Sequence, residues 1–153
     1  MNLLTQQEVE LVLEKTANKA GVSPVIQKIG IAVLRAESNL DPMACCFNLP
    51  NRKALYNCVF DGGEKILHKI TNKVYTINKE KKTLTYRDEV LKYWSWDRGC
   101  CMWNSFFWKD ITDEIAFDPE QALPPFWYWF SRKPNWWGGY SSGNWHKFYG
   151  KET

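Results

Sequence analysis

The feature that most constrains this chain is an acidic residue on the apolar stripe of a predicted helix. Ser23-Pro24 begins the helix, because serine caps the first amides and proline fits the first turn. One face then carries, at steps of three, four and four, Ile26, Ile29, Val33 and Glu37. Asp41-Pro42 disfavours helical backbone, so the helix ends shortly after Glu37.

This position predicts a raised pKa for Glu37. The carboxyl end of a helix is negative and the neighbouring residues of the stripe are apolar, and both effects disfavour a carboxylate. A carboxylic acid that keeps its proton near neutral pH is what protonation of a glycosidic oxygen requires. The alternative is a structural glutamate, bound by backbone amides or paired with Arg35 or Arg98. Helix position alone leaves both interpretations open.

Other local patterns predict a mixture of helices and strands in one domain, residues 1–153. Thr5 and Glu8 form a capping box, which predicts a helix over residues 5–20. Residues 70–87 predict a β-hairpin with a solvated turn at Lys79-Glu80. Thr112 and Asp118 mark further helix starts, and Pro124-Pro125 is expected to break the chain. No apolar stretch approaches the roughly 20 residues that span a membrane.

Tryptophan is concentrated in one part of the chain, since all nine lie between Trp94 and Trp145. A core position is expected for Trp94, Trp96, Trp103 and Trp108. Aromatic rings among glycine and serine are candidates for stacking on sugar rings, with packing as an equal alternative. These substrate-binding candidates are Trp136, Trp137, Tyr140 and Trp145.

The cysteines and the charge exclude several classes of site. The five cysteines show no CxxC spacing, so we predict neither a metal site nor a cofactor. They are expected to be small buried residues, and one disulfide between Cys45-Cys46 and Cys100-Cys101 is the alternative. A net charge of +3 without a helix-turn-helix or zinc-finger pattern does not indicate nucleic-acid binding.

Three strings carry a resemblance to a known family. Residues 36–42, AESNLDP, resemble the glutamate motif of the lysozyme-like superfamily, which includes soluble lytic transglycosylases and goose- and hen-type lysozymes. Residues 97–108, DRGCCMWNSFFW, resemble the second motif of that superfamily, and residues 112–119, TDEIAFDP, the next segment of phage-encoded members. The resemblance implies a mainly helical α+β, lysozyme-like fold with a small β-hairpin or sheet and a glycan cleft between the lobes.

The resemblance also implies roles for individual residues. Glu37 matches the catalytic general acid, and Asp97 falls where hen-type lysozymes keep a second carboxylate. Gly99 matches a tight-turn glycine. The positions expected to border the substrate are Ser38, which holds the turn after the helix, Asn104, and Met102, which stands where the family has glutamine.

The implied activity is cleavage of the β-1,4 bond between N-acetylmuramic acid and N-acetylglucosamine in peptidoglycan, by a phage-type lytic transglycosylase that leaves a 1,6-anhydro product. A hydrolytic muramidase that uses Asp97 is one alternative, and a non-catalytic peptidoglycan-binding domain is another. The expected partners are glycan strands and phage virion or tail proteins. No secretory signal is visible, so the protein is expected to be made in the cytoplasm and to reach the bacterial wall with the virion or by delivery.

Overall fold

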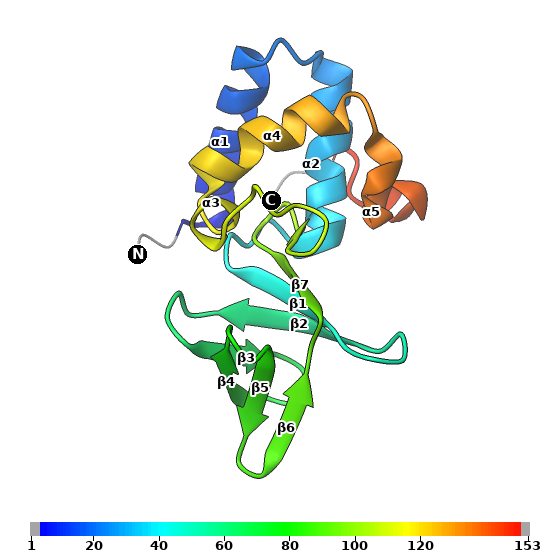
Figure 1. Ribbon diagram of the computed structural model, residues 1–153. Helices are drawn as coiled ribbons and strands as arrows, with labels where there is room; N and C mark the ends of the chain where they lie inside the picture. Colours follow the sequence, from blue (N-terminus) through cyan, green and yellow to red (C-terminus); the bar gives the residue numbers. More distant parts are fainter. Residues whose placement is uncertain (1–3, 151–153) are drawn as a thin grey trace.

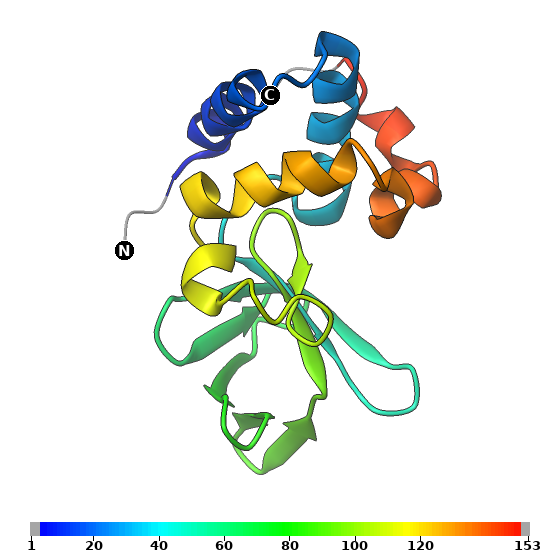
Figure 2. The same ribbon diagram turned by 45° about the horizontal axis from the view of Figure 1, so that its top comes forward.

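The computed structural model describes residues 4–150, so the first and last three residues of the predicted domain lie outside the described part. Helices gather in one half of the molecule and strands in the other (Figures 1 and 2). Each half has its own buried cluster. The helical cluster includes Leu13, Leu34 and Trp127, and the sheet cluster includes Phe47 and Ile66.

The two N-terminal helices are confirmed. Helix α1 (Gln6–Lys19) begins at Thr5, whose side chain accepts from the Glu8 amide while the Glu8 side chain accepts from the Thr5 amide. Helix α2 (Pro24–Ser38) begins at Ser23 and ends at Asn39, which has left-handed backbone with φ 54°. The chain therefore turns away directly after Glu37 and Ser38.

All strands of the described chain belong to one antiparallel sheet of eight, in the order β6-β5-β4-β3-β2-β1-β7-β8. The strands are β1 (Ala44–Asn48), β2 (Ala54–Phe60), β3 (Lys65–His68), β4 (Val74–Asn78), β5 (Thr83–Tyr86), β6 (Glu89–Lys92), β7 (Ser95–Arg98) and β8 (Trp103–Asn104). The predicted hairpin is confirmed as β4 and β5, with Ile77 opposite Leu84.

The predicted fold class, a mainly helical lysozyme-like fold with a small β-hairpin or sheet, is wrong. The sheet has eight strands and crosses the whole strand half of the molecule. Most strands have only two to five residues, too few to show a clear alternation. In β1, residues 44–47 are all buried, so its sequence does not alternate between apolar and polar.

The expected break at Pro124-Pro125 is also wrong, because helix α4 (Pro119–Phe130) runs through both prolines. Each proline removes a helical hydrogen bond from the carbonyl four residues earlier. Those carbonyls belong to Glu120 and Gln121, which are exposed and accessible to water. Burial of the opposite face, above all of Phe126 and Trp127, outweighs the loss.

The Gly/Ser-rich end of the chain, predicted as a loop, forms short helices instead. They are η1 (Pro134–Trp136), α5 (Gly138–Ser141) and η2 (Asn144–Lys147). Both α5 and η2 contact α2, and Figure 1 shows α5 beside it. The short helix α3 (Asp113–Ala116) precedes α4 and begins at Thr112, as predicted. None of the helices in residues 4–150 is both long and apolar enough to cross a lipid bilayer.

Candidate functional site

A cavity of about 630 Å³ brings Glu37 and Asp97 together. Its walls come from both halves of the molecule: the end of α2, strands β7 and β8 with the loop after them, α4, and the segment from η1 to α5. The lining residues are Glu37, Asp97, Met102, Trp103, Asn104, Phe107, Trp108, Trp129, Trp136, Trp137 and Gly138. Two acids and a largely aromatic wall therefore face one space.

Glu37 lies in the last turn of α2 and accepts a hydrogen bond at Oε1 from the Gly139 amide at 2.6 Å. Burial raises the pKa of Glu37 above its ordinary value; the Gly139 N–H opposes this increase, and the charge of Asp97 adds to it. Within residues 4–150 no cation pairs with Glu37. Arg35 pairs with Glu10 instead, and Arg98 with Asp113.

The backbone donor of this hydrogen bond comes from a close contact that glycine favours. A Cβ at Gly139 would lie 3.1 Å from the Val33 carbonyl oxygen and 3.3 Å from Cγ of Glu37. The absence of a side chain therefore lets α5 approach α2 closely enough for its amide to reach the carboxyl group. Sequence reasoning missed Gly139, although the Gly138-Gly139 pair was a visible signal.

Asp97 lies on β7, where its carboxyl group is held by an amide side chain from the neighbouring strand. Asn104 Nδ2 donates to Asp97 Oδ1 at 2.8 Å. Burial raises the pKa of Asp97, while the Asn104 and Asn48 amides and the Arg98 charge oppose the increase. Asn104 Oδ1 also accepts from the Phe106 and Phe107 amides at 2.9 and 3.1 Å. One side chain thus orients Asp97 and fixes the loop beside the cavity.

Ser38, Met102 and Gly99, which were also singled out by the motifs, occupy different surroundings. Ser38 does not line the cavity; it is buried and donates to the Cys100 carbonyl at 2.7 Å, which ties the end of α2 to the loop after β7. Met102 lines the cavity with a φ of 53°. Gly99 has a φ of 78°, and a Cβ there would meet the Ala116 carbonyl oxygen at 1.9 Å. A glycine is therefore required in this turn.

The four C-terminal aromatic candidates divide into two pairs. Trp136 and Trp137 line the cavity, but Trp136 is 54 % exposed whereas Trp137 is 6 % exposed and donates from Nε1 to the Cys101 carbonyl at 3.1 Å. Tyr140 and Trp145 stack on each other with ring centres 5.9 Å apart, and they pack against the helical cluster rather than lining the cavity. Of these four candidates, Trp136 is the one whose ring is largely exposed at the cavity.

The tryptophans expected in the core also differ among themselves. Trp96 and Trp103 are buried, as predicted, although an edge of Trp103 reaches the cavity. Trp94 is 46 % exposed and belongs to neither buried cluster, so a core position was wrong for it. Trp108 is half-buried and packs against the helical cluster, and it also lines the cavity. The ring of Trp108 lies 5.7 Å from those of Trp129 and Trp136. These three rings form one aromatic wall.

Phe107 and Trp129 were not predicted as site residues. Trp129 belongs to the aromatic run of α4, whose pattern indicates burial and does not show which ring faces outward. Phe107 follows Asn104 in the loop, where its amide is bound but its side chain is 70 % exposed. Neither position had a sequence signal beyond its aromatic character.

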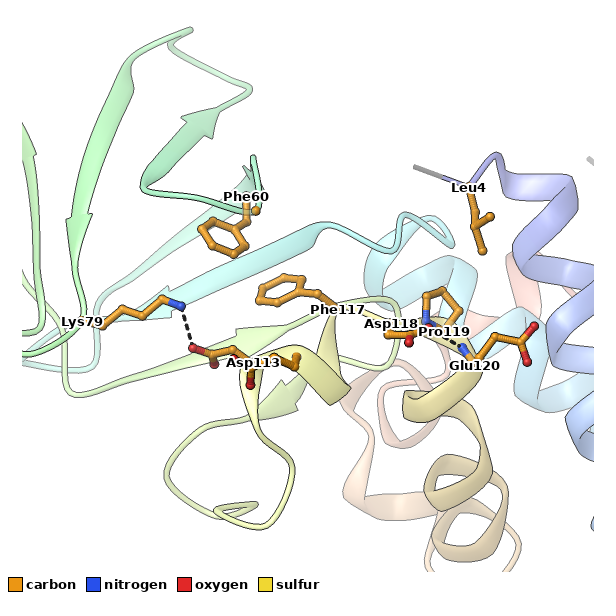
Figure 3. Close-up of a pocket in the computed structure, with 10 residues that line it drawn as sticks. Leu4, Phe60, Lys79, Asp113, Phe117, Asp118, Pro119 and Glu120 are labelled. Carbon is orange, nitrogen blue, oxygen red and sulfur yellow. Dashed lines mark hydrogen bonds and ion pairs between the residues drawn. The ribbon is translucent and has the colours of Figure 1, made fainter. Parts of the chain in front are cut away.

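A second cavity, of about 660 Å³, lies where Lys79 and Phe60 of the sheet half face Phe117 and Pro119 (Figure 3). Two of its four acids pair with cations. Asp113 binds Lys79 and Arg98 at 2.9 Å each, which holds its pKa below the ordinary value. Glu120 pairs with Lys15. An acid held ionised by cations is a poor proton donor, so Asp113 does not compete with Glu37 for acid catalysis.

The cysteines behave as small apolar residues. All five are buried free thiols, so the alternative of a disulfide between the two adjacent pairs is not seen. Cys46 is close enough to Asp97 and Glu37 to feel both charges, and burial raises its pKa to about 12. A thiol with such a pKa is not ionised at neutral pH and does not serve as a nucleophile.

The cavity therefore combines a half-buried acid with a raised pKa, a second carboxyl group oriented by an amide, and an aromatic wall. Comparisons of the chain with protein-family models, with curated proteins and with solved structures found no match.

Proposed function

We propose that this protein cleaves glycosidic bonds in peptidoglycan, with Glu37 as the general acid. The observation that carries the proposal is the setting of Glu37: half-buried in the wall of a cavity, without a cation partner in residues 4–150, and with its pKa raised by desolvation and by Asp97. An acid whose pKa is raised keeps its proton to a higher pH than an ordinary glutamate and can deliver it to a leaving oxygen. The resemblance of the strings around Glu37 and Asp97 to lysozyme-like motifs supports the same chemistry.

The preferred chemistry is that of a lytic transglycosylase. Glu37 gives its proton to the glycosidic oxygen while the bond from that oxygen to C1 of the muramyl sugar breaks. The resulting carboxylate then takes the proton of the 6-hydroxyl of the same muramyl sugar, and the oxygen of that hydroxyl bonds to C1. The product is a 1,6-anhydro sugar, and Glu37 has regained its proton without a second carboxylate or a water molecule.

A hydrolytic route is the second candidate, and the position of Asp97 in the same cavity favours it. In that route Asp97 stabilises positive charge at C1 in the transition state, and water completes the reaction. The hydrogen bond from Asn104 fixes the Asp97 carboxyl group in one orientation, as electrostatic stabilisation requires.

The aromatic wall suits a sugar substrate. Trp108, Trp129 and the exposed Trp136 present ring faces or edges to the cavity, and such rings pack against the apolar face of a pyranose. A non-catalytic glycan-binding domain would use the same wall, so binding alone does not test the proposal.

The test is release of soluble fragments from purified peptidoglycan, with their masses determined. Wild type should release muropeptides that end in a 1,6-anhydro muramyl sugar. Each is lighter by one water than the corresponding hydrolytic product, which ends in a reducing sugar. Glu37→Gln keeps the Gly139 hydrogen bond but cannot donate the catalytic proton, so release should fall by about 10²–10⁴-fold. Release close to the wild-type level by a folded Glu37→Gln would contradict the assignment, and glycan binding without any release would indicate the binding domain.

A further inference from the structure

We propose that the glycan strand continues out of the cavity onto a second aromatic surface, the outer patch, formed by Trp94, Phe106 and Phe107. This inference rests on the proposed function and adds the form of the substrate: a polymer longer than the cavity holds. The side chains of the outer patch are 46 %, 49 % and 70 % exposed, respectively. Large apolar side chains grouped on a surface mark an interaction site more often than scattered ones do.

The three rings form a connected surface. The Trp94 ring lies edge-on to Phe106 at 5.6 Å, and the Phe106 ring lies edge-on to Phe107 at 5.2 Å. Phe107 also lines the cavity that holds Glu37 and Asp97. The outer patch is thus continuous with the candidate site, because one of its members belongs to both.

The backbone under the outer patch is held in place by specific hydrogen bonds. Asn104 Oδ1 accepts from the Phe106 and Phe107 amides, while its Nδ2 donates to Asp97. The Trp94 amide donates to the Asn48 carbonyl at 3.0 Å. The side chain that orients a carboxyl group of the site therefore also holds the backbone that carries two rings of the outer patch. A pre-ordered surface loses little entropy when a ligand binds.

The chemistry of the outer patch fits the strand better than it fits a second apolar surface. Lys109 places its ammonium group 5.2 Å from the centre of the Phe106 ring, so the patch carries positive charge. The lactyl groups of muramyl sugars carry free carboxylates in strands stripped of stem peptides. In intact peptidoglycan these groups are amide-linked to the peptides, which carry carboxylates of their own. The sugar rings have apolar faces. Exposed aromatic rings beside a cation match both features of such a polymer.

The experiment measures how affinity depends on chain length in the Glu37→Gln background, where the strand is not cut. The probes are long soluble glycan strands prepared from peptidoglycan and a tetrasaccharide of the same sugars. Trp94→Ala and Phe106→Ala should lower the ratio of the two affinities, long strand over tetrasaccharide, by about fivefold each. Trp94→Tyr, which keeps an aromatic face, should restore most of the ratio. The matched control is Tyr56→Ala, since Tyr56 is 64 % exposed and lies outside the outer patch and both cavities; it should leave the ratio unchanged.

Several results would overturn the inference. They are an unchanged ratio in Trp94→Ala and Phe106→Ala, an equal loss of both affinities, absence of strand binding, or a change in oligomeric state that shows the patch to contact a second copy. The proposed function fails separately. If wild type releases no muropeptides but the Glu37→Gln variants bind strands with the expected ratios, catalysis is contradicted and the outer patch stands.

Discussion

The amide of Gly139 donates to Oε1 of Glu37 across 2.6 Å, although the two residues are far apart in the sequence. This hydrogen bond favours the ionised acid, whereas burial and the nearby Asp97 favour the protonated one. Burial is the largest of these effects, so the pKa of Glu37 is raised. The backbone of α5 therefore limits the rise in the pKa of Glu37 and also fixes the position of its carboxyl group.

Gly139→Ala should change that balance in a defined direction. A Cβ would lie tightly against the Val33 carbonyl and Glu37 itself, so we expect α5 to shift by a few tenths of an ångström and the hydrogen bond to lengthen. The ionised form then loses support, and the pH at which activity falls should move upward. The control is Gly138→Ala in the same short helix, where the new Cβ meets only Glu37 Oε1, at an ordinary 3.7 Å. A shift to lower pH, or an equal shift in Gly138→Ala, would show that the Gly139 amide does not set the acidity.

Glu37→Gln should affect stability in a pH-dependent way. Because the folded-state pKa of Glu37 is raised, its contribution to stability is fully present below the ordinary glutamate pKa and is lost as pH rises through the raised pKa. The glutamine variant should therefore melt at a higher temperature than wild type at pH 7–8 and show no such advantage near pH 4. Thermal unfolding across this range measures the difference. A variant that is less stable at neutral pH would mean that the carboxylate is favourably solvated in the folded protein.

Asp97→Asn should distinguish the two chemistries. In a hydrolase, loss of the negative charge should reduce turnover by about 10²-fold or more, as when an electrostatic group of a transition state is removed. In a transglycosylase the effect should be modest, because the 6-hydroxyl completes the reaction. Initial rates of muropeptide release and product masses should be measured together. An inactive but stably folded Asp97→Asn would contradict the transglycosylase preference.

The adjacent tryptophans 136 and 137 should respond differently to alanine. Trp136 is largely exposed at the cavity, so its removal should weaken glycan binding by about 1 kcal/mol or more with little change in stability. Trp137 is buried and hydrogen-bonded to Cys101, so its removal should cost about 3–5 kcal/mol of unfolding free energy. Denaturant unfolding and glycan titration of both variants test this contrast. If Trp136→Ala also lost about 3–5 kcal/mol of unfolding free energy, Trp136 would be a packing residue and not a glycan-binding one.

The sequence predicted those elements whose formation depends on residues close to one another in the chain. The capping box at Thr5, the helix that ends near Glu37 and the β4–β5 hairpin depend on neighbouring residues, and all three are present. The sheet could not be predicted in the same way. Strand β1 lies between β2 and β7, and its pairing of Cys46 with Asp97 joins distant segments. No periodicity within either short strand encodes that partner.

In the candidate site, too, some residues could be predicted from local sequence and others depend on tertiary packing. Glu37 and Asp97 stood out through their motifs, and the structure places both in one cavity. Gly139 reaches Glu37, and Trp129 reaches the cavity, only through tertiary packing, and the sequence does not show which ring of an aromatic run faces outward. Ser38, expected to border the substrate, is instead buried against the Cys100 carbonyl. Its role depends on the position of a loop that sequence reasoning could not place.

The central position of β1 also has a consequence for how the chain folds. Helix α2 closes through local contacts, whereas the pairing of β7 with β1 joins distant segments and carries the entropy cost of closing a long loop. We therefore expect Glu37 and Asp97 to meet late in folding. A nascent or partly folded chain carries the acid without the cavity that gives it a raised pKa, so the chemistry of the site is withheld until the sheet is complete.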